Sequence, residues 1–244
     1  MAREKNNEQR QKILKTVYAL FLEKGYNAIT MKDIAKECNI NVSLLQYYFY
    51  KKDDILVHII FNIILSVSQF ISDHFAEEIK NENEDAVYLN SALFYVLFYS
   101  LLEANDYQLL RLYIHVLAQA ELIKSGIDFA EDALSCYPQT INTPEMRKKR
   151  QTIDYVISGY MTQFVLLYFE RRNWETLDIT VQKAIDTGLY AAGANTTVRK
   201  HTLELTNSLV TDDVKEKCQD NLSFYLDKFV ACDWKGINHI TQHL

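Results

Sequence analysis

Apolar residues recur at intervals of three and four along most of the chain, which is the spacing of helices that bury one face. The first such stretch runs from Asn7 to Lys24, and Gly25 follows it in the position where helices commonly end. The chain holds only six Gly and two Pro, and it lacks stretches in which Val and Thr alternate with polar residues. Strand and turn signals are therefore few, and the pattern predicts an all-α protein.

Two short helices are predicted directly after the first one. Thr30 can cap a helix, with Asp33 placed three residues later to complete a capping box. Asn39 tolerates the left-handed conformation of a tight turn, and Asn41 can cap a further helix from Val42 to Tyr48. A longer helix followed by two short ones with a tight turn between them is the layout of a helix-turn-helix module.

Longer helices are predicted for the rest of the chain, without an internal repeat or a low-complexity linker. They run from Lys51 or Lys52 to Lys80, from Ala86 to Glu103, from Tyr107 to Lys124, from Phe129 to Ser135, from Pro144 to Arg172, from Glu175 to Ala192, from Val198 to Leu209 and from Val214 to Trp234. We predict two domains, a helix-turn-helix domain in residues 1–52 and a helical body in residues 53–244.

The stretch from Ile55 to Ile71 is the nearest approach to a membrane span. It carries His58, Asn62, Ser66 and Gln69, which fall on one stripe of a helix. This spacing predicts an amphipathic helix of a soluble protein. The polar start of the chain lacks the apolar core of a signal peptide, so we expect a cytoplasmic protein.

Charge is divided unevenly along the chain. The net charge of −6 taken alone argues against a nucleic-acid-binding protein. Residues 1–52, however, hold ten Lys or Arg against five Asp or Glu, whereas residues 53–244 hold 16 against 27. A basic head on an acidic body is drawn to a polyanion in one orientation.

Between residues 21 and 56 a set of residues follows a fixed order and spacing. The set is Phe21, Gly25, Tyr26, Thr30, Asp33, Ile34, Ala35, Tyr47, Tyr48, Phe49 and Lys51 to Leu56. It resembles the DNA-binding signature of the TetR family of bacterial transcription regulators, and it covers about fifty of the 244 residues. The resemblance implies a homodimeric repressor that binds a palindromic double-stranded DNA operator through its N-terminal domain. It also implies that the larger helical domain dimerises and binds a small-molecule effector.

Some positions depart from the family pattern. Asn39 stands where the family commonly has Gly, and Val42, Leu44 and Gln46 stand where it more often has Lys, a small polar residue and Tyr. The helical layout survives these changes because Asn can adopt the turn conformation and Leu45 still faces the core. The changes alter the surface that would contact DNA bases.

Side chains that point outward from the helix at 42–48 would meet base edges in a major groove. Gln46 is suited to a bidentate contact with adenine, and Val42 and Leu44 are suited to thymine methyl groups. Contacts to phosphate are predicted for Thr30, Ser43, Tyr47, Tyr48 and Lys52. These assignments predict an operator rich in A/T pairs. Each residue taken alone also fits an ordinary core or surface position, and the assembled spacing favours DNA contact.

The helical body is rich in aromatic residues, which can line an apolar pocket or fill a core. Core packing is the favoured interpretation for any single one of them. His115 and Gln119 lie one helical turn apart and are candidate polar anchors, although hydrogen bonding within the core explains them as well. The predicted effector-binding residues are Tyr95, Phe98, Tyr113, His115, Gln119, Tyr155 and Gln163.

The resemblance places dimerisation on the helices predicted at 144–172 and 175–192. Small residues that would permit close approach of helices there are Gly159, Ala184, Ala191 and Ala192. Residues 195–244 exceed the family's common layout, and they could form an extra layer on the dimer or on the pocket.

Other chemistry is weakly indicated. The four cysteines, Cys38, Cys136, Cys218 and Cys232, are widely spaced, which predicts reduced thiols rather than a disulfide framework or a zinc finger. His239 and His243 have the spacing of metal ligands but no carboxylate between them, so no metal or other cofactor is expected. Phosphate-binding loops and nucleophile elbows are absent from the sequence, and we expect no enzyme. The alternative is a helical small-molecule-binding protein or enzyme whose N-terminal module serves only assembly.

Overall fold

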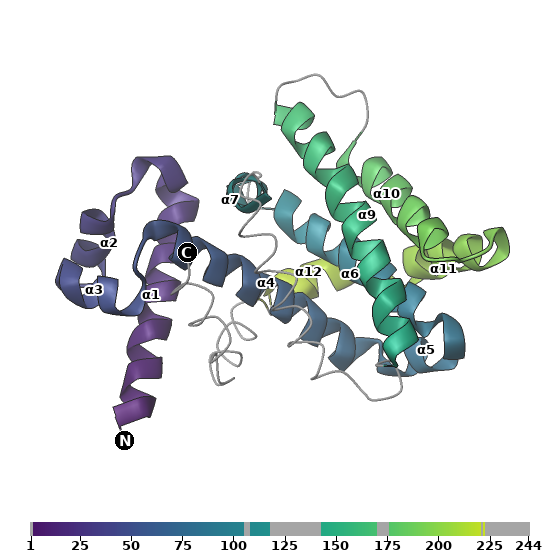
Figure 1. Ribbon diagram of the computed structural model, residues 1–244, viewed down its shortest axis with the longest axis horizontal. Helices are drawn as coiled ribbons and strands as arrows, with labels where there is room; N and C mark the ends of the chain where they lie inside the picture. The colour runs from purple at the N-terminus through teal and green to yellow at the C-terminus, as the bar shows by residue number, and fades with distance from the viewer. Residues whose placement is uncertain (1, 105–107, 118–142, 170–175, 221, 223–244) are drawn as a thin grey trace. The chain divides into compact units, whose positions relative to one another are not determined.

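The computed structural model describes residues 2–104, 108–117, 143–169, 176–220 and 222, and every regular element among them is a helix (Figure 1). This confirms the all-α prediction. The described residues fall into two compact units, one made of residues 2–66, 104 and 108–117, and the other of residues 67–103, 143–169, 176–220 and 222. The predicted domain boundary after residue 52 stays a prediction, since α4 (Lys52–His74) runs through both units.

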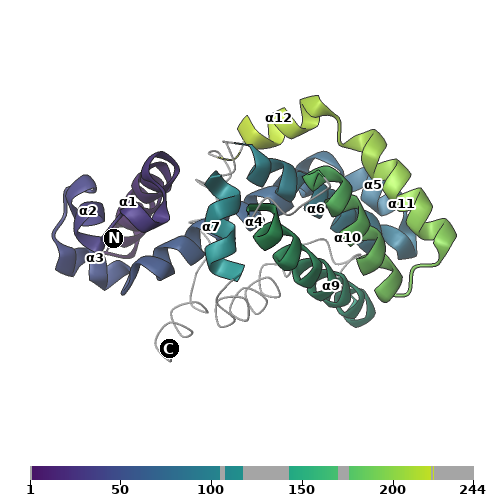
Figure 2. The ribbon, with the colours of Figure 1, turned by 90° about the horizontal axis from the view of Figure 1, so that it is seen from above.

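The first unit begins with α1 (Ala2–Lys24), the 3-10 helix η1 (Tyr26–Ala28), α2 (Met31–Glu37) and α3 (Val42–Tyr48). Gly25 joins α1 to η1 with a positive φ of 77°, a conformation that favours glycine. Figure 2 shows α2 and α3 beside α1. Side chains from α1, α2, α3 and α4 and from Phe49 directly after α3 form the core, among them Ile13, Val17, Phe21, Ile34, Leu45, Phe49 and Ile55.

Helix α7 (Gln108–Leu117) also belongs to the first unit, where it packs on α1. Its buried side chains are Leu109, Leu110, Leu112 and Tyr113. The helix was predicted to continue to Lys124. That continuation and the helix predicted from Phe129 to Ser135 lie outside the described residues, as do Cys136, Cys232, His239 and His243.

The structure corrects the prediction for α4 in two respects. The helix ends at His74 and not at Lys80, because Phe75 leaves the helical conformation with φ −127° and ψ 17°. Phe75 is buried beside the ring of Phe70, and the short helix α5 (Ala76–Asn81) starts after it. Burial of this apolar ring contributes more free energy than one further residue of regular helix would, so α4 ends here.

Three of the four residues in the polar stripe of α4 are buried, whereas Gln69 is half-buried and donates to the Asp73 carboxylate. His58, Asn62 and Ser66 are 4%, 3% and 2% exposed. Asn62 donates to the carbonyl of His58 at 2.7 Å, and Ser66 donates to the carbonyl of Asn62 at 2.6 Å. Hydrogen bonds back to the helix itself therefore let this stripe enter the interior.

The second unit is built around α6 (Ala86–Glu103), of which every residue except Ser100 and Glu103 is buried. Around it pack α5, α9 (Pro144–Phe169), α10 (Leu177–Ala191), α11 (Thr196–Leu209) and α12 (Asp212–Asp220). The predicted helix from Val214 to Trp234 thus starts two residues earlier, and its part after Asp220 is outside the description apart from the buried Leu222.

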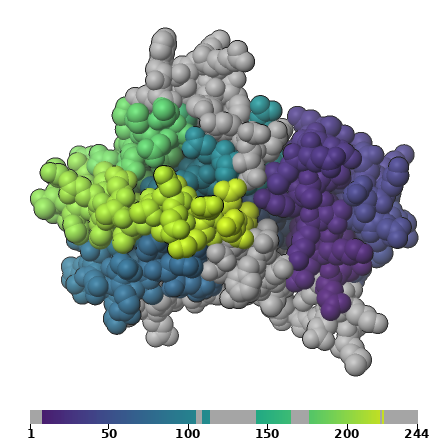
Figure 3. Space-filling view, turned by 180° about the vertical axis from the view of Figure 1, so that it is seen from behind, coloured from purple at the N-terminus to yellow at the C-terminus, as the bar shows by residue number. Residues whose placement is uncertain are grey.

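The sequence suggests that residues 195–244 could form an extra layer on the dimer or on the pocket. The structure shows that residues 196–220 cover α6. In Figure 3, α11 and α12 form a continuous yellow-green and yellow band across one face of the second unit. The buried face of this band includes Thr202, Thr206, Val210 and Cys218. The segment is therefore a structural layer of the second unit.

In the described part of the chain, two helical segments are long and apolar enough to cross a membrane, residues 52–74 and 83–103. Their most apolar windows are 83% and 89% buried inside the protein. Such burial is typical of core helices, because a membrane span would present its apolar side chains to lipid.

Helices α9 and α10 are antiparallel and closely packed, as Figure 1 shows. Gly188 of α10 makes this possible, since a Cβ atom there would lie 3.0 Å from the Cγ1 of Ile157 and 3.3 Å from the Cγ2 of Ile153. Ala184, one turn earlier, is fully buried. Small residues on α10 thus bring the two helices together within one chain.

We predict that Gly188→Leu destabilises the protein by about 2 kcal/mol, because the added side chain must displace two buried isoleucines. Thr187→Leu, which adds apolar bulk at an exposed position one residue away, is the matched control and should change stability by less than about 0.5 kcal/mol. Urea unfolding followed by circular dichroism measures both. Equal midpoints for the two variants would show that the α9–α10 contact tolerates the larger side chain.

Candidate nucleic-acid interface

Helix α2 begins at a complete capping box. The Thr30 hydroxyl accepts from the Asp33 amide at 3.3 Å, and the Asp33 carboxylate accepts from the Thr30 amide at 2.9 Å. The Thr30 hydroxyl also donates to this carboxylate, and these bonds lower the pKa of Asp33. A cap of this kind stabilises a helix by about 1 kcal/mol, which matters for a helix of seven residues. The predicted capping box is confirmed.

The turn between α2 and α3 has the predicted chemistry. Asn39 adopts φ 53°, the left-handed conformation that asparagine tolerates. The Ile40 amide then donates to the Ala35 carbonyl at 2.9 Å. The Asn41 side chain accepts from the Leu44 amide at 2.7 Å and caps α3, which spans the predicted residues Val42 to Tyr48.

Helix α3 divides its side chains sharply between core and surface. Leu45 is fully buried, and Phe49 directly after the helix is 2% exposed. Ser43, Leu44, Gln46 and Tyr47 are exposed, with Leu44 at 37% and Tyr47 at 72%, whereas Val42 and Tyr48 are half-buried. We call the residues of α3 that are not packed in the core the reading face: Val42, Ser43, Leu44, Gln46 and Tyr47. They comprise the three predicted base-contacting residues, Val42, Leu44 and Gln46, and two of the predicted phosphate-contacting residues.

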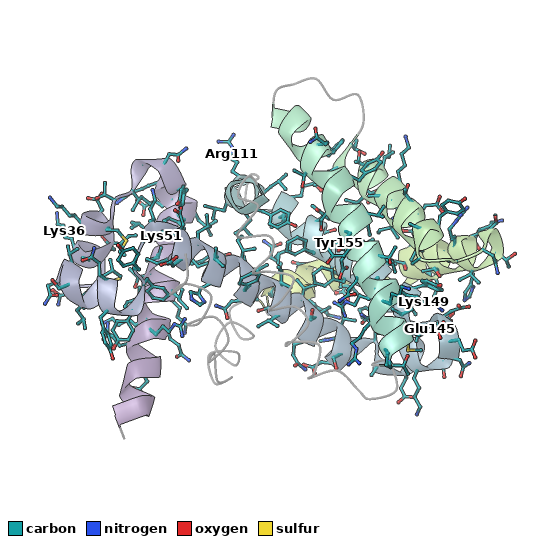
Figure 4. All side chains as sticks on the ribbon, in the orientation of Figure 1. Lys36, Lys51, Arg111, Glu145, Lys149 and Tyr155 are labelled. Carbon is teal, nitrogen blue, oxygen red and sulfur yellow. The ribbon has the colours of Figure 1, made fainter. Side chains whose placement is uncertain are left out.

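Two exposed residues beside the reading face were missed by the sequence reasoning. Tyr50 is 77% exposed, and Lys51 follows it on the surface. Lys36 of α2 is also exposed, and Figure 4 labels it with Lys51 on the first unit. The excess of Lys and Arg in residues 1–52 was the feature of the sequence that could have identified the two lysines as candidate DNA contacts. No feature of the sequence indicated that Tyr50 is exposed, because an aromatic residue beside Phe49 fits a core position equally well.

Lys52 differs from its neighbour Lys51. Its Nζ donates to the Tyr26 and Ile29 carbonyls, each at 2.8 Å, and lies 3.9 Å from the centre of the Tyr26 ring. Burial lowers the pKa of Lys52, and the Asp53 carboxylate opposes this shift. The predicted phosphate contact of Lys52 stays a prediction, and the structure gives its ammonium acceptors inside the protein.

Comparison with known proteins agrees with this geometry. Residues 13–59 match the family model described as bacterial regulatory proteins, tetR family. Residues 13–59 are therefore similar to the DNA-binding module of the TetR family. The match covers α1 from Ile13 onward, both short helices and the first turns of α4.

Curated relatives are similar to part of this chain. An uncharacterized HTH-type transcriptional regulator, YerO of Bacillus subtilis (strain 168), is 32% identical over 79 residues, which are 32% of this chain and 25% of the relative. The HTH-type transcriptional regulator HbdR of Aromatoleum sp. (strain CIB) is 36% identical over 64 residues, 26% of this chain and 28% of HbdR. The chain thus matches about a quarter of the length of these relatives. No solved structure matches it.

The predicted effector-binding residues lie in different surroundings. Tyr95 and Phe98 are buried on α6, and Tyr113 is buried on α7 of the first unit. Tyr155 is 57% exposed on α9, and Gln163 is exposed on the same helix. The side chain of His115 and the whole of Gln119 lie outside the described residues. The effector-binding set stays a prediction.

A polar cluster beside Tyr95 was not predicted. The Tyr95 hydroxyl donates to the Asp154 carboxylate at 2.7 Å, and the Arg150 guanidinium lies 3.7 Å from the other Asp154 oxygen. Burial raises the pKa of Asp154, and the charge of Arg150 and the bond from Tyr95 oppose that shift. The spacing of Arg150 and Asp154, four residues apart, was the signal in the sequence. The cluster joins α6 to α9.

A buried histidine joins three elements of the DNA-binding module. The Arg10 guanidinium donates to Nε2 of His58 at 2.8 Å and lies 5.4 Å from the centre of the Phe49 ring. The rings of Phe49 and His58 meet edge to face at 5.4 Å. Burial, followed by the charge of Arg10, lowers the pKa of His58 well below its usual 6.5. His58 is therefore neutral and accepts the Arg10 hydrogen bond.

This histidine should make stability depend on pH. Below pH 6.5 the unfolded chain protonates His58 while the folded protein does not, so stability is lost as the pH falls towards the lowered folded pKa. The loss is up to about 1.4 kcal/mol per pH unit for one proton. His58→Gln keeps an acceptor for Arg10 and should show a shallower loss of unfolding free energy between about pH 6.5 and 5. Parallel curves for His58→Gln and the wild type would contradict a neutral buried His58.

Proposed function

We propose that this chain is a homodimeric, sequence-specific DNA-binding regulator that represses its target genes and is released from its operator by a small apolar or amphipathic effector. The reading face is the observation that carries this proposal. Leu44, Tyr47 and Tyr50 are the exposed large hydrophobic residues among the described part of the first unit, and all three lie on or directly after α3. Clustered exposed apolar side chains indicate a binding surface.

The composition of the reading face favours contacts to bases. Helix α3 contains no charged residue, so its outer surface offers the Gln46 amide and the apolar side chains of Val42 and Leu44. An amide can pair with the N6 and N7 atoms of adenine, and apolar groups fit the thymine methyl. We therefore propose an operator with A/T pairs at the positions that α3 contacts.

Contacts to the phosphate backbone would come from the surroundings of α3. Thr30, Ser43, Tyr47 and Tyr48 carry hydroxyl groups, and Lys36 and Lys51 add exposed cations. Hydroxyl and ammonium groups typically bind phosphate and set the register of the protein on the duplex. Affinity and base preference would thus come from different residues.

DNA binding with the wild-type protein should weaken steeply with salt, because phosphate contacts release counterions. Selection from random duplexes recovers the half-site that the protein binds. In this half-site, Gln46→Ala should reduce the preference for adenine at one position by about tenfold to a hundredfold. Lys200→Ala, at an exposed lysine of the second unit, is the matched control and should bind as the wild type does. Fluorescence anisotropy measures the affinities.

A selection that recovers G/C pairs at the contacted positions would refute the A/T operator. If the protein binds no recovered duplex in a salt-dependent way, the proposed function as a DNA-binding regulator is refuted. That result would favour a helical small-molecule-binding protein whose N-terminal module serves assembly.

The proposed dimer interface is the outer surface of α9 and α10. Tyr155, Tyr160, Ile179 and Tyr190 are exposed there at 57%, 39%, 47% and 67%, and they are the exposed large hydrophobic residues of the second unit as far as it is described. Of the small residues predicted to permit close approach, Gly159 and Ala191 are exposed, Ala192 is half-buried, and Ala184 is occupied in packing within the chain. A two-fold dimer would present two α3 helices to a palindromic site.

Tyr160→Arg together with Ile179→Arg should convert the dimer into a monomer of 28.5 kDa, because two charges would have to be buried in the interface of each subunit. Ser208→Arg, at an exposed position on α11, should leave the dimer intact. Sedimentation velocity measures the mass. A double variant that sediments as the wild-type dimer would place the interface elsewhere.

A small-molecule effector is supported by the aromatic content of α6, where Tyr88, Phe94, Tyr95, Phe98 and Tyr99 are all buried. Aromatic side chains with hydroxyl groups can bind an apolar or amphipathic molecule. Native mass spectrometry of the purified protein would reveal a co-purified ligand, and addition of that ligand should release the operator. A ligand that binds and leaves DNA affinity unchanged would refute the proposed release, since an effector must favour one state over the other.

A further inference from the structure

The first turn of α4 is tied to the connection between α1 and α2 through one tyrosine. Lys52 donates to the Tyr26 carbonyl and lies over the Tyr26 ring, and the Tyr26 hydroxyl donates to the Asp53 carboxylate. The Tyr26 ring also meets the fully buried ring of Phe21 edge to face at 5.3 Å. We call Tyr26, Lys52 and Asp53 the Tyr26 latch.

The latch reaches the start of α2 through Ile29. The second hydrogen bond of Lys52 goes to the Ile29 carbonyl at 2.8 Å, and Ile29 is 2% exposed. The next residue is Thr30, the cap of α2 and a proposed phosphate contact. Lys52 therefore links the residue before the cap of α2 to the first turn of α4.

We infer that Lys52 is a positioning residue, which raises DNA affinity by holding Ile29 and the capped start of α2 in place and does not itself bind phosphate. This inference rests on the proposed DNA-binding function. It replaces the phosphate contact expected for Lys52 from the sequence.

The chemistry of the ammonium group supports this role. An ammonium has three N–H donors, and Lys52 gives two of them to backbone carbonyls while the aromatic ring covers the group from another side. Movement of Nζ to a phosphate would leave both carbonyls without their charged donor. Lys51 is exposed one residue earlier and can meet a phosphate without breaking any of these contacts.

The two roles differ in the salt dependence of DNA binding. A lysine that neutralises a phosphate contributes about 0.9 to the slope of log K against log salt, whereas a lysine that binds inside the protein contributes nothing to it. Lys52→Met keeps the apolar stem and removes the donors, and Lys51→Met is the matched change at the neighbouring exposed lysine. Lys52→Arg keeps a cation with several donors, and Tyr26→Phe weakens the latch without removing any cation.

The experiment measures binding of the full-length variants to a duplex selected with the wild-type protein, over a range of KCl concentrations and well below the thermal unfolding midpoint of each variant. We expect Lys52→Met to lower the affinity about tenfold at every salt concentration with the slope unchanged, as for the loss of one or two charge-assisted hydrogen bonds. Lys52→Arg should restore part of the affinity. Tyr26→Phe should give a smaller loss, also without a change in slope, and Lys51→Met should reduce the slope by about 0.9.

Two results would overturn the inference. A slope reduced by about 0.9 in Lys52→Met would show that Lys52 binds phosphate directly. An unchanged affinity in folded Lys52→Met, with only a lower unfolding midpoint, would show a purely structural role. If Lys52→Met does not fold, Tyr26→Phe decides, since a latch without influence on DNA binding leaves the affinity of this variant at the wild-type value. Failure of the wild type to bind any duplex is a separate result, which refutes the proposed function.

Discussion

Burial of Leu45 and Phe49 is the constraint on which the candidate interface depends. A helix of seven residues is unstable in water by itself, so α3 forms only where the rest of the module accepts these two side chains. Once they are buried, helical geometry leaves Leu44, Gln46 and Tyr47 pointing outward. Phe49 also connects α3 to α4 and α1, since its ring contacts His58 and Arg10.

The polar interactions around this core act mainly on geometry. The capping box at Thr30 determines where α2 begins, and the left-handed Asn39 and the cap at Asn41 determine where α2 ends and α3 begins. The Tyr26 latch and the Arg10–His58 hydrogen bond connect the remaining elements of the module to α4. Each bond contributes little net free energy, because water would satisfy the same groups in the unfolded chain. Their directionality, however, makes the arrangement specific.

Sequence reasoning succeeded where structure depends on neighbours in the chain. The capping residues and the bounds of α3 and α6 follow from side chains within three or four positions of one another, so the sequence alone predicts them. It failed at Phe75, where burial of a ring ended α4, and on the stripe of His58, Asn62 and Ser66, which is buried. Those outcomes depend on partners that are distant along the chain, and helical periodicity does not identify partners.

The features of the candidate interface likewise fall into those that the sequence predicts and those that depend on the fold. The sequence by itself determined the all-α class, the helix-turn-helix with its caps and turn, the basic character of residues 1–52 and the kinship of this module with the TetR family. These features are local in the chain or are preserved as spacing. Only the tertiary structure decided that Tyr50 is exposed and that Lys52 binds the Tyr26 and Ile29 carbonyls while Lys51 faces solvent. Adjacent residues of the same type thus acquire different surroundings, because packing determines which side chain meets backbone carbonyls and which meets water.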